Sequence, residues 1–345
     1  MRIVSYQTEW RDRYAHFLKS CENALFFHSL SYLDFLCELL GSTNRSLLAL
    51  DEAGQLLGIL PLLRLDGLGG IMLNSLPFYG SHGGTLAHNE KTSAALLDAY
   101  NAGLADERIA GATLVENLRD PWSYAKVTHR YVDVRIGQIT PIAHPDDHAA
   151  RLMKSYHFKT RNMVRKGQRS GLRVVVENGS IDVLAAMHKE NLAALGGIAK
   201  PNRFFDLLNK YFVADSDYKL YLAYKDDHPV SALLLFYFGS TVEYYVPATD
   251  VAYRELQPLS LLIFEAMIEA SRAGYRWWNW GGTWKTQEGV YRFKSRWGTK
   301  DYPYRYYTAL NNTEILSWSK EKILSAYPFF YVAPFSALVE QAKAS

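Results

Sequence analysis

The chain has 345 residues, of which 48% are hydrophobic and 21% are charged, and its formal net charge is +3. This composition is that of a folded globular protein and excludes a disordered or fibrous chain. The length exceeds what one hydrophobic core usually supports, so we expect two domains. The longest apolar runs are far shorter than the roughly 20 residues of a membrane-spanning helix. The N-terminus lacks the apolar region of a signal peptide, and we expect a cytoplasmic protein.

The first half of the chain begins with a predicted β-hairpin over residues 47–65, whose turn lies at the acidic and glycine-containing stretch 51–54. A short strand with a loop (71–84), a helix (about 91–106) and a further strand (112–117) are predicted to follow. This order of elements matters because the second half repeats it.

In the second half, residues 219–239 predict another hairpin, with its turn at Asp226–Pro229. A strand (242–250), a helix (258–273) and a last strand (275–280) follow in the same order as before. The repetition indicates an internal duplication.

Hairpin, strand, helix and strand are the order of the GNAT acyltransferase fold, a mixed sheet with helices on its faces. We therefore expect an α/β protein with two tandem GNAT-like domains, residues 1–145 on the acceptor side and residues 146–310 carrying the donor and transfer site. Residues 311–345 are predicted to form a helical tail packed on the core. Contact of this tail with a membrane surface is the alternative, although it lacks the cationic face that such helices carry.

Positive charge is concentrated in two stretches. Residues 151–173 hold eight Lys or Arg and no acid, and residues 292–305 hold five against one acid, while the rest of the chain is acidic on balance. Local cationic zones position an anionic ligand. The first stretch is predicted to be a helix that begins at Asp146 or Asp147 and runs to about residue 168.

The second cationic stretch begins with YRFKSRWG (291–298). Its alternation predicts a strand in which Tyr291 and Phe293 pack on one side while Arg292 and Lys294 face outward. Gly281 and Gly282 directly follow the preceding strand, where a ligand can reach the backbone.

Two further segments are candidate ligand contacts. In SLPFYGSHGGTL (75–86) the glycines permit close approach of a ligand, and Tyr79 and His82 supply polar groups. The helix beginning near Pro258 follows Arg254, and its N-terminus is a candidate anion site.

Several common chemistries lack their motifs. There is no GxSxG, GxxxxGK[ST] or HExxH sequence, and Cys21 and Cys37 fit no metal spacing, so we expect no metal and no disulfide.

The segment WNWGGTWKTQEGVYRFKSRWG (278–298) closely resembles a signature of the Fem family, which the related BioF2-like acyltransferases share. In this signature a strand ending in Gly-Gly precedes YxFKxxWG. Fem proteins are tandem GNAT-fold transferases that use aminoacyl-tRNA to build peptidoglycan cross-bridges. The resemblance implies an enzyme of this kind, and LPFYGSHGG and the basic helix resemble the family's acceptor loop and the start of its second domain.

The resemblance also implies roles for individual residues. Phe293 and Lys294 match the family's Phe-Lys pair at the transfer site, where Lys294 would stabilise charge on the carbonyl or leaving oxygen. Tyr245 matches a tyrosine that contacts the acceptor. Lys200, or alternatively Arg203, lies where the family places a basic residue on the acceptor's phosphates.

The implied reaction is amide formation between an activated acyl group and an amine. The donor is acyl-CoA or aminoacyl-tRNA: the helical hairpin of tRNA-handling members is missing, and Tyr253–Ser260 lacks the glycine loop that holds coenzyme A. The acceptor is expected to be an amine on a small-molecule, lipid-linked or nucleotide-linked precursor of the cell envelope or a polysaccharide. The proton acceptor stays open among Glu243, Asp250, His82 and the donor. A non-catalytic module that binds nucleic acid or another polyanion is the alternative from another class. For the acyltransferase we expect tRNA as a possible partner and no DNA.

Overall fold

The computed structural model describes residues 1–75, 82–194, 196–284, 286–334 and 337–338. The chain divides into two compact units, one formed by residues 1–136 with 303–345 and the other by residues 137–302. Strands β9 (Tyr131–Pro141) and β15 (Lys300–Leu310) carry the chain from one unit to the other.

The first unit contains two sheets. One has the strand order β1-β3-β4-β7, and the other places β15, β8, β6, β5 and β2 side by side. The helices of this unit within the described residues include α1 (Arg11–Ser20), α2 (Leu30–Leu40) and α3 (Glu90–Gly103). The strands are β1 (Arg2–Ser5), β2 (Thr43–Asn44), β3 (Leu47–Leu50), β4 (Leu56–Leu60), β5 (Leu63–Gly67), β6 (Gly70–Asn74), β7 (Leu86–Ala87) and β8 (Ile109–Val115).

The predicted first hairpin is confirmed, because β3 and β4 pair antiparallel across the turn. The second arm of the hairpin is shorter than expected: β4 ends at Leu60, before Pro61, and the chain resumes as β5, which pairs with β6 in the other sheet. Proline cannot donate a backbone hydrogen bond, which explains why the strand is interrupted here.

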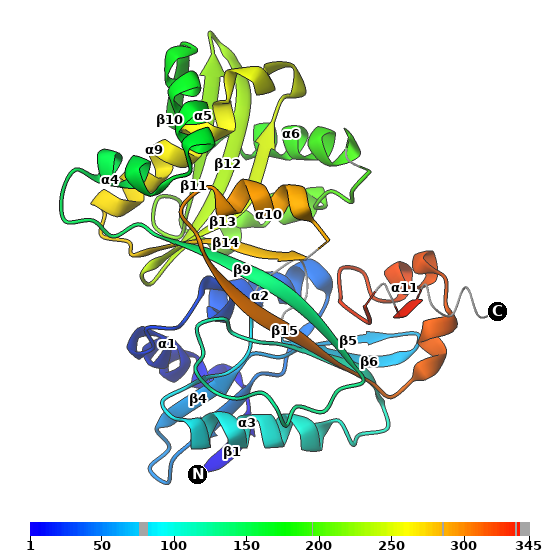
Figure 1. Ribbon diagram of the computed structural model, residues 1–345. Coiled ribbons are helices and arrows are strands. Elements are labelled where there is room, and N and C mark those ends of the chain that lie inside the picture. Colours follow the sequence, from blue (N-terminus) through cyan, green and yellow to red (C-terminus); the bar gives the residue numbers. More distant parts are fainter. Residues whose placement is uncertain (76–81, 195, 285, 335–336, 339–345) are drawn as a thin grey trace. The chain divides into compact units, whose positions relative to one another are not determined.

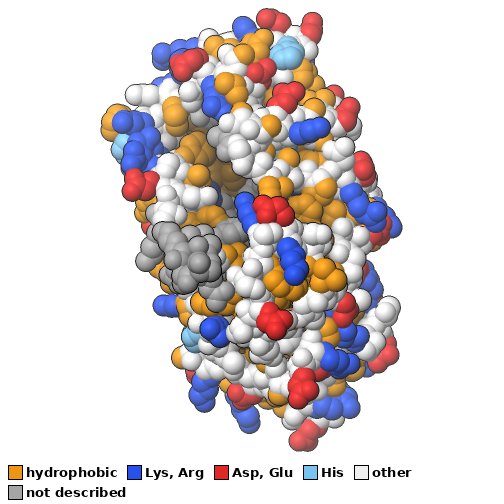
Figure 2. Space-filling model, turned by 90° about the vertical axis from the view of Figure 1, so that its right-hand side faces the viewer, with side chains coloured by type: hydrophobic (Ala, Val, Ile, Leu, Met, Phe, Trp, Pro, Cys, Tyr) orange, Lys and Arg blue, Asp and Glu red, His pale blue; other side chains and the backbone are white. Residues whose placement is uncertain are grey.

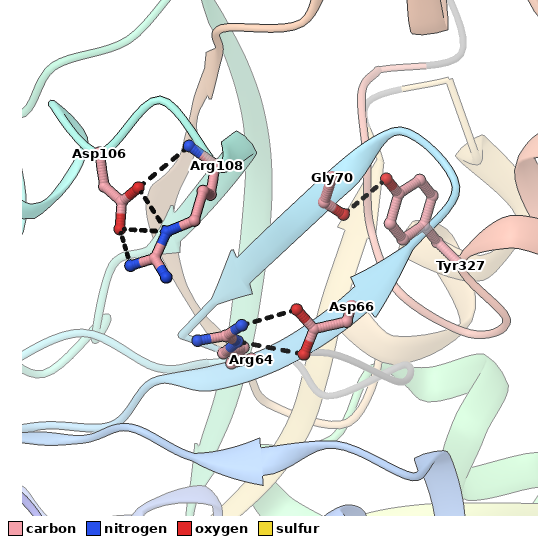
Figure 3. Close-up of polar contacts among 6 residues, drawn as sticks. All are labelled: Arg64, Asp66, Gly70, Asp106, Arg108 and Tyr327. Carbon is pink, nitrogen blue, oxygen red and sulfur yellow. Dashed lines mark hydrogen bonds and ion pairs between the residues drawn. The ribbon is translucent and has the colours of Figure 1, made fainter.

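The segment after β15 packs on this first unit. It contains the 3-10 turn η4 (Thr313–Ser317) and helix α11 (Lys320–Ala326), and Ile315 is fully buried. Tyr327 donates a hydrogen bond of 2.9 Å to the carbonyl of Gly70 at the β5–β6 turn (Figure 3). A side chain at Gly67 would overlap the Tyr327 ring at 2.3 Å, so the glycine makes this contact possible. The described part of the tail therefore packs on the first unit.

The second unit is a sheet of β10, β11, β12, β13 and β14 with helices on both faces (Figure 1). The strands are β10 (Leu172–Val176), β11 (Tyr218–Lys225), β12 (His228–Phe238), β13 (Thr241–Thr249) and β14 (Trp277–Trp284). The helices include α4 (His148–Ser155), α5 (Phe158–Arg169), α6 (Ile181–Ala194), α7 (Asn202–Asp206), α8 (Leu208–Tyr211), α9 (Pro258–Arg272) and α10 (Glu288–Ser295). The predicted second hairpin is confirmed by the antiparallel pairing of β11 with β12, with Asp226 in the left-handed conformation at the turn.

The predicted basic helix is two helices rather than one. Helix α4 ends at Ser155, Tyr156 is extended, and α5 begins at Phe158. The Tyr156 ring is buried and lies 5.0 Å from the Trp297 ring, and Arg161 donates a hydrogen bond to the Tyr156 carbonyl. The Tyr156 side chain at the break therefore belongs to the core of this unit.

Candidate active site

The two central strands of the second unit separate after a short pairing. β13 and β14 run parallel and pair only from Thr241 to Glu243 and from Trp277 to Asn279, although β13 continues to Thr249 and β14 to Trp284. A bulge in the β12–β13 pairing lies at Tyr244 and Tyr245, just beyond this point. Such bulges redirect side chains and are frequent beside active sites. The separation leaves backbone of both strands available to a ligand.

Polar side chains are buried where the two strands part. Glu243 and Asn279, the last pair of the parallel register, are 2% and 0% exposed, and Thr283 further along β14 is 1% exposed. Burial of polar groups disfavours folding unless they are hydrogen-bonded, and functional sites retain such groups despite the cost, so this cluster inside a sheet is a candidate site.

The first part of YRFKSRWG (291–298) lies in helix α10, and the predicted strand is wrong. With helical spacing, Phe293 and Trp297 fall on one face, and the Phe293 ring lies 6.1 Å from Trp280 and 6.2 Å from Trp297. The predicted outward orientation of Lys294 is wrong as well, because its side chain is buried. Arg292 does face outward, 3.7 Å from Glu288 one turn earlier.

Lys294 connects α10 to the end of β14. Its Nζ donates to the Thr283 hydroxyl at 3.0 Å and to the Gly282 carbonyl at 3.3 Å. An ammonium has three N–H donors, so one remains for a ligand beyond these two acceptors within the described residues. Burial lowers the pKa of Lys294 to about 8, which keeps the group mostly charged at neutral pH.

The other residues of the segment hold α10 against the sheet. The Tyr291 hydroxyl donates to Asp301 at 2.6 Å, and Trp297 is fully buried. Gly298 adopts a left-handed conformation (φ 73°), and a Cβ there would lie 3.0 Å from the Ser155 hydroxyl. The contacts of Tyr291, Trp297 and Gly298 therefore fix α10 against the sheet, and with it the position of Lys294.

A second cluster lies on α7 and β13, and it brings together two predicted site residues. The Lys200 ammonium lies 4.9 Å from the ring centres of both Phe204 and Tyr245, which stack at 5.9 Å. Although Lys200 as a whole residue is partly exposed, its ammonium is enclosed, and this burial lowers the pKa of Lys200 to about 7. Aromatic faces favour the charged form and oppose this effect, but burial dominates.

His188 supports the same cluster from α6. Its Nε2 accepts a hydrogen bond of 3.1 Å from the Lys200 backbone N–H, and burial together with the nearby Lys200 charge lowers the pKa of His188 to about 4. His188 is therefore neutral at physiological pH and acts here as an acceptor. Sequence patterns did not indicate His188, Phe204 or Thr283, because the contacts that define them link segments distant in the chain.

The remaining predicted residues of this unit lie in different surroundings. Gly281 is left-handed (φ 72°), and its N–H donates to the Asn279 side chain, so the Gly-Gly pair does form a special backbone geometry at the strand separation. Arg203 is exposed on α7, and Arg254 is exposed in the 3-10 turn η3 (Val251–Leu256) before α9. Gln257, rather than a glycine, takes the left-handed conformation that precedes Pro258.

The acceptor-loop residues belong to the first unit. His82 is fully buried, with its ring 4.7 Å from Tyr304 and 6.1 Å from Phe27, so it does not project from the loop as expected. Tyr79 lies outside the described residues. The acceptor roles of His82 and Tyr79 stay predictions.

Neither a membrane span nor a metal cluster is found in the part of the chain that the structure describes. Its helices are all too short or too polar to cross a bilayer. No group of three or more His, Cys, Asp or Glu residues there is arranged to hold a metal ion.

Comparison with known proteins shows a similarity to one domain family and to several solved structures. Residues 155–295 match the family described as an acetyltransferase (GNAT) domain. No curated protein matches the chain in sequence. Among solved structures, FemX is similar with a TM-score of 0.65 and 16% identity, over 91% of this chain and 98% of that chain.

Two other structures show the same architecture. A conserved protein of unknown function from Bacteroides thetaiotaomicron has a TM-score of 0.56 and 11% identity, over 90% of this chain and 100% of its own. A tandem GNAT protein from the clavulanic acid biosynthesis pathway has a TM-score of 0.50 and 10% identity, over 90% of this chain and 98% of its own. The predicted fold class, a mixed α/β protein with a tandem GNAT-like fold, is thus confirmed.

Proposed function

Since residues 155–295 match an acetyltransferase (GNAT) domain, we propose that the chain is an acyltransferase that joins an activated acyl or aminoacyl group to an amine of a cell-envelope or polysaccharide precursor. The observation that carries the proposal is the buried Lys294 ammonium at the end of β14, next to the point where β13 and β14 separate. The match to an acetyltransferase domain argues against the alternative of a non-catalytic polyanion-binding module. Among the side chains coloured in Figure 2, cationic and anionic groups are interspersed.

Lys294 would act on the oxygen that becomes negative during the reaction. A neutral amine attacks the acyl carbonyl, a tetrahedral intermediate forms with charge on its oxygen, and the thiolate of coenzyme A or the ribose oxygen of tRNA leaves. Thr283 and Gly282 accept two hydrogen bonds from the Lys294 ammonium and so fix its direction. Its third N–H is the donor that would stabilise the negative oxygen. Removing one such donor typically lowers the rate by 100- to 1,000-fold.

Glu243 is the best placed of the candidate proton acceptors. It lies buried at the last paired position of β13, whereas Asp250 accepts a hydrogen bond from the Ala252 N–H and serves as the N-cap of η3. His82 belongs to the first unit. We therefore assign to Glu243 the proton that the substrate ammonium loses before the neutral amine attacks. The nitrogen loses its second proton as the tetrahedral intermediate collapses to the amide, and the leaving thiolate or ribose oxygen takes up that proton.

One observation favours aminoacyl-tRNA as the second candidate donor. Lys159, Arg165, Lys166 and Arg169 lie on the exposed face of α5, and no acidic residue occurs in that helix. Lys166 contacts Glu255 in η3 at 3.1 Å, so this cationic face adjoins the segment before α9. A tRNA carries many more phosphates than coenzyme A, and each phosphate that contacts this cationic face adds electrostatic attraction.

Calorimetric titration of acetyl-CoA tests the donor, with wild type, Lys294→Ala and the exposed control Lys91→Ala compared. We expect saturable binding in all three, since Lys294 acts on the reacting carbonyl, and loss of acyl transfer to amino-sugar acceptors in Lys294→Ala alone. Binding of aminoacyl-tRNA without any heat from acetyl-CoA would assign the second donor. Protein that neither binds nor consumes either donor with amine acceptors present would overturn the proposal.

A further inference from the structure

Helix α10 packs on the sheet along its second turn, whereas its first turn borders open space. In the second turn Lys294 is buried, and Trp297, which directly follows the helix, is fully buried. In the first turn Val290 is 44% exposed. A Cβ atom added at Gly289 would meet no atom of the described residues within 4 Å. The helix therefore lies close to the sheet at one end only.

Val290 lies on the inward side of this helix in spite of its exposure. Residues three and four positions apart share one face of a helix, and Phe293 and Lys294 are at these spacings from Val290. Both pack toward the sheet, because Lys294 is buried and the Phe293 ring lies 6.1 Å from Trp280. Arg292 marks the outer side, where it pairs with Glu288. The exposed surface of Val290 therefore faces the space on the sheet side of α10.

The side chain of Lys294 brings its ammonium toward the same space. Long side chains of a helix lean toward its N-terminus and cover the preceding turn, which here carries Val290. The ammonium donates to the Thr283 hydroxyl at 3.0 Å, near the end of β14. An apolar side chain thus adjoins the charged group that the proposed function places at the oxygen of the reacting carbonyl.

The chemistry of an acyl donor selects what fills this space. A carbonyl carbon whose oxygen is bound by Lys294 also carries the leaving group and the remainder of the acyl group, and the amine approaches it. Coenzyme A, tRNA and the amine are polar, whereas an alkyl group is apolar. The alkyl part of the acyl group is therefore the part that gains from contact with Val290 and Phe293, since this contact removes apolar surface from water.

We propose that Val290 is a specificity-determining contact for the transferred group, and that this group carries an apolar side chain or an alkyl chain longer than acetyl. The inference rests on the proposed function, because the role of Lys294 gives the position of the carbonyl. Each methylene group that apolar surface covers favours binding about fourfold. A butyryl donor has two more methylene groups than an acetyl donor and should bind roughly 15-fold more tightly.

Calorimetric titration of acetyl-, propionyl- and butyryl-CoA into the full chain tests the inference without an acceptor. In the wild type we expect the affinity to rise about fourfold with each methylene group. Val290→Ala removes two methyl groups, and Val290→Thr keeps the volume but replaces a methyl group by a hydroxyl. Each variant should reduce the butyryl-to-acetyl ratio of affinities at least about threefold. Val213→Ala, at a valine that is 65% exposed in the same unit, is the matched control and should leave the ratio unchanged.

One tRNA charged with either glycine or valine provides the corresponding pair for the second candidate donor, and filter binding measures its affinity. We expect the valyl form to bind more tightly to the wild type, and Val290→Ala to reduce this preference. Whichever donor binds, equal affinity across its series, or a preference that both Val290 variants leave intact, would overturn the inference while the proposed function stands. A chain that binds neither donor would overturn the proposed function and the inference with it. Circular dichroism confirms that each variant is folded.

Discussion

Replacement of Lys294 by methionine tests two separate effects of this residue, one on the stability of the fold and one on the proposed reaction. Burial lowers the pKa of Lys294 from 10.5 to about 8. Because one pKa unit corresponds to about 1.4 kcal/mol, the buried charge destabilises the folded state by about 3 kcal/mol at neutral pH. Methionine fills a similar volume without the charge. The Thr283 hydroxyl and the Gly282 carbonyl lose their donor, however, and this loss offsets about 1–3 kcal/mol of the gain in stability.

The sign of the pH dependence follows from the same values. Between pH 8 and 10.5 the unfolded chain holds the Lys294 proton and the folded chain does not, so the free energy of unfolding rises with pH in this window. Relative to Lys294→Met, wild type should gain about 2–3 kcal/mol between pH 7 and pH 10. Urea denaturation of both proteins over this pH range measures the difference between their free energies of unfolding. The titration of other groups is common to both proteins and cancels in this difference.

The same protonation should govern the reaction. Acyl transfer by the wild type should decline above pH 8 as the Lys294 ammonium loses its proton, and Lys294→Met should lack activity at every pH. A difference in unfolding free energy that stays constant from pH 7 to pH 10 would refute the assignment of a depressed pKa. An active Lys294→Met variant would refute the charge-stabilising role.

Two further predictions concern the supports of the site. Gly298→Ala should lower the free energy of unfolding by about 1–3 kcal/mol, because the backbone there is left-handed and the added methyl meets Ser155. Gly289→Ala, in α10 with open space around it, is the control and should be neutral or stabilising in thermal denaturation. Burial is the larger cause of the lowered pKa of His188 and the Lys200 charge the smaller one, so Lys200→Met should raise this pKa only in part. Histidine NMR titration that shows no change between the wild type and Lys200→Met would contradict a contribution of the Lys200 charge.

Much of the fold follows from local patterns in the sequence. The turns at residues 51–54 and 226–229 are composed of residues that favour tight turns, and they locate both hairpins. Pro258 at the first turn of α9 and the repeated order of elements indicate the tandem fold. These features depend on neighbouring residues alone, and for that reason sequence analysis predicts them well.

Tertiary packing decided the conformation of residues 291–298. In residues 291–298 the apolar and charged positions fit both the two-residue period of a strand and the spacing of a short helix, so periodicity does not distinguish them. The contacts of Phe293 and Trp297 with Trp280 select the helix. That choice turns Lys294 inward, where burial lowers its pKa to about 8.

The sequence by itself determined which residue types are available: a lysine after phenylalanine, two glycines after a strand, and a tyrosine on the neighbouring strand. Only the tertiary structure decided that Lys294 reaches Thr283 and that Lys200 lies over Tyr245, 45 positions later in the chain. The physical reason is that desolvation and ring contacts arise from the packing of distant segments, whereas propensity and periodicity act between neighbours.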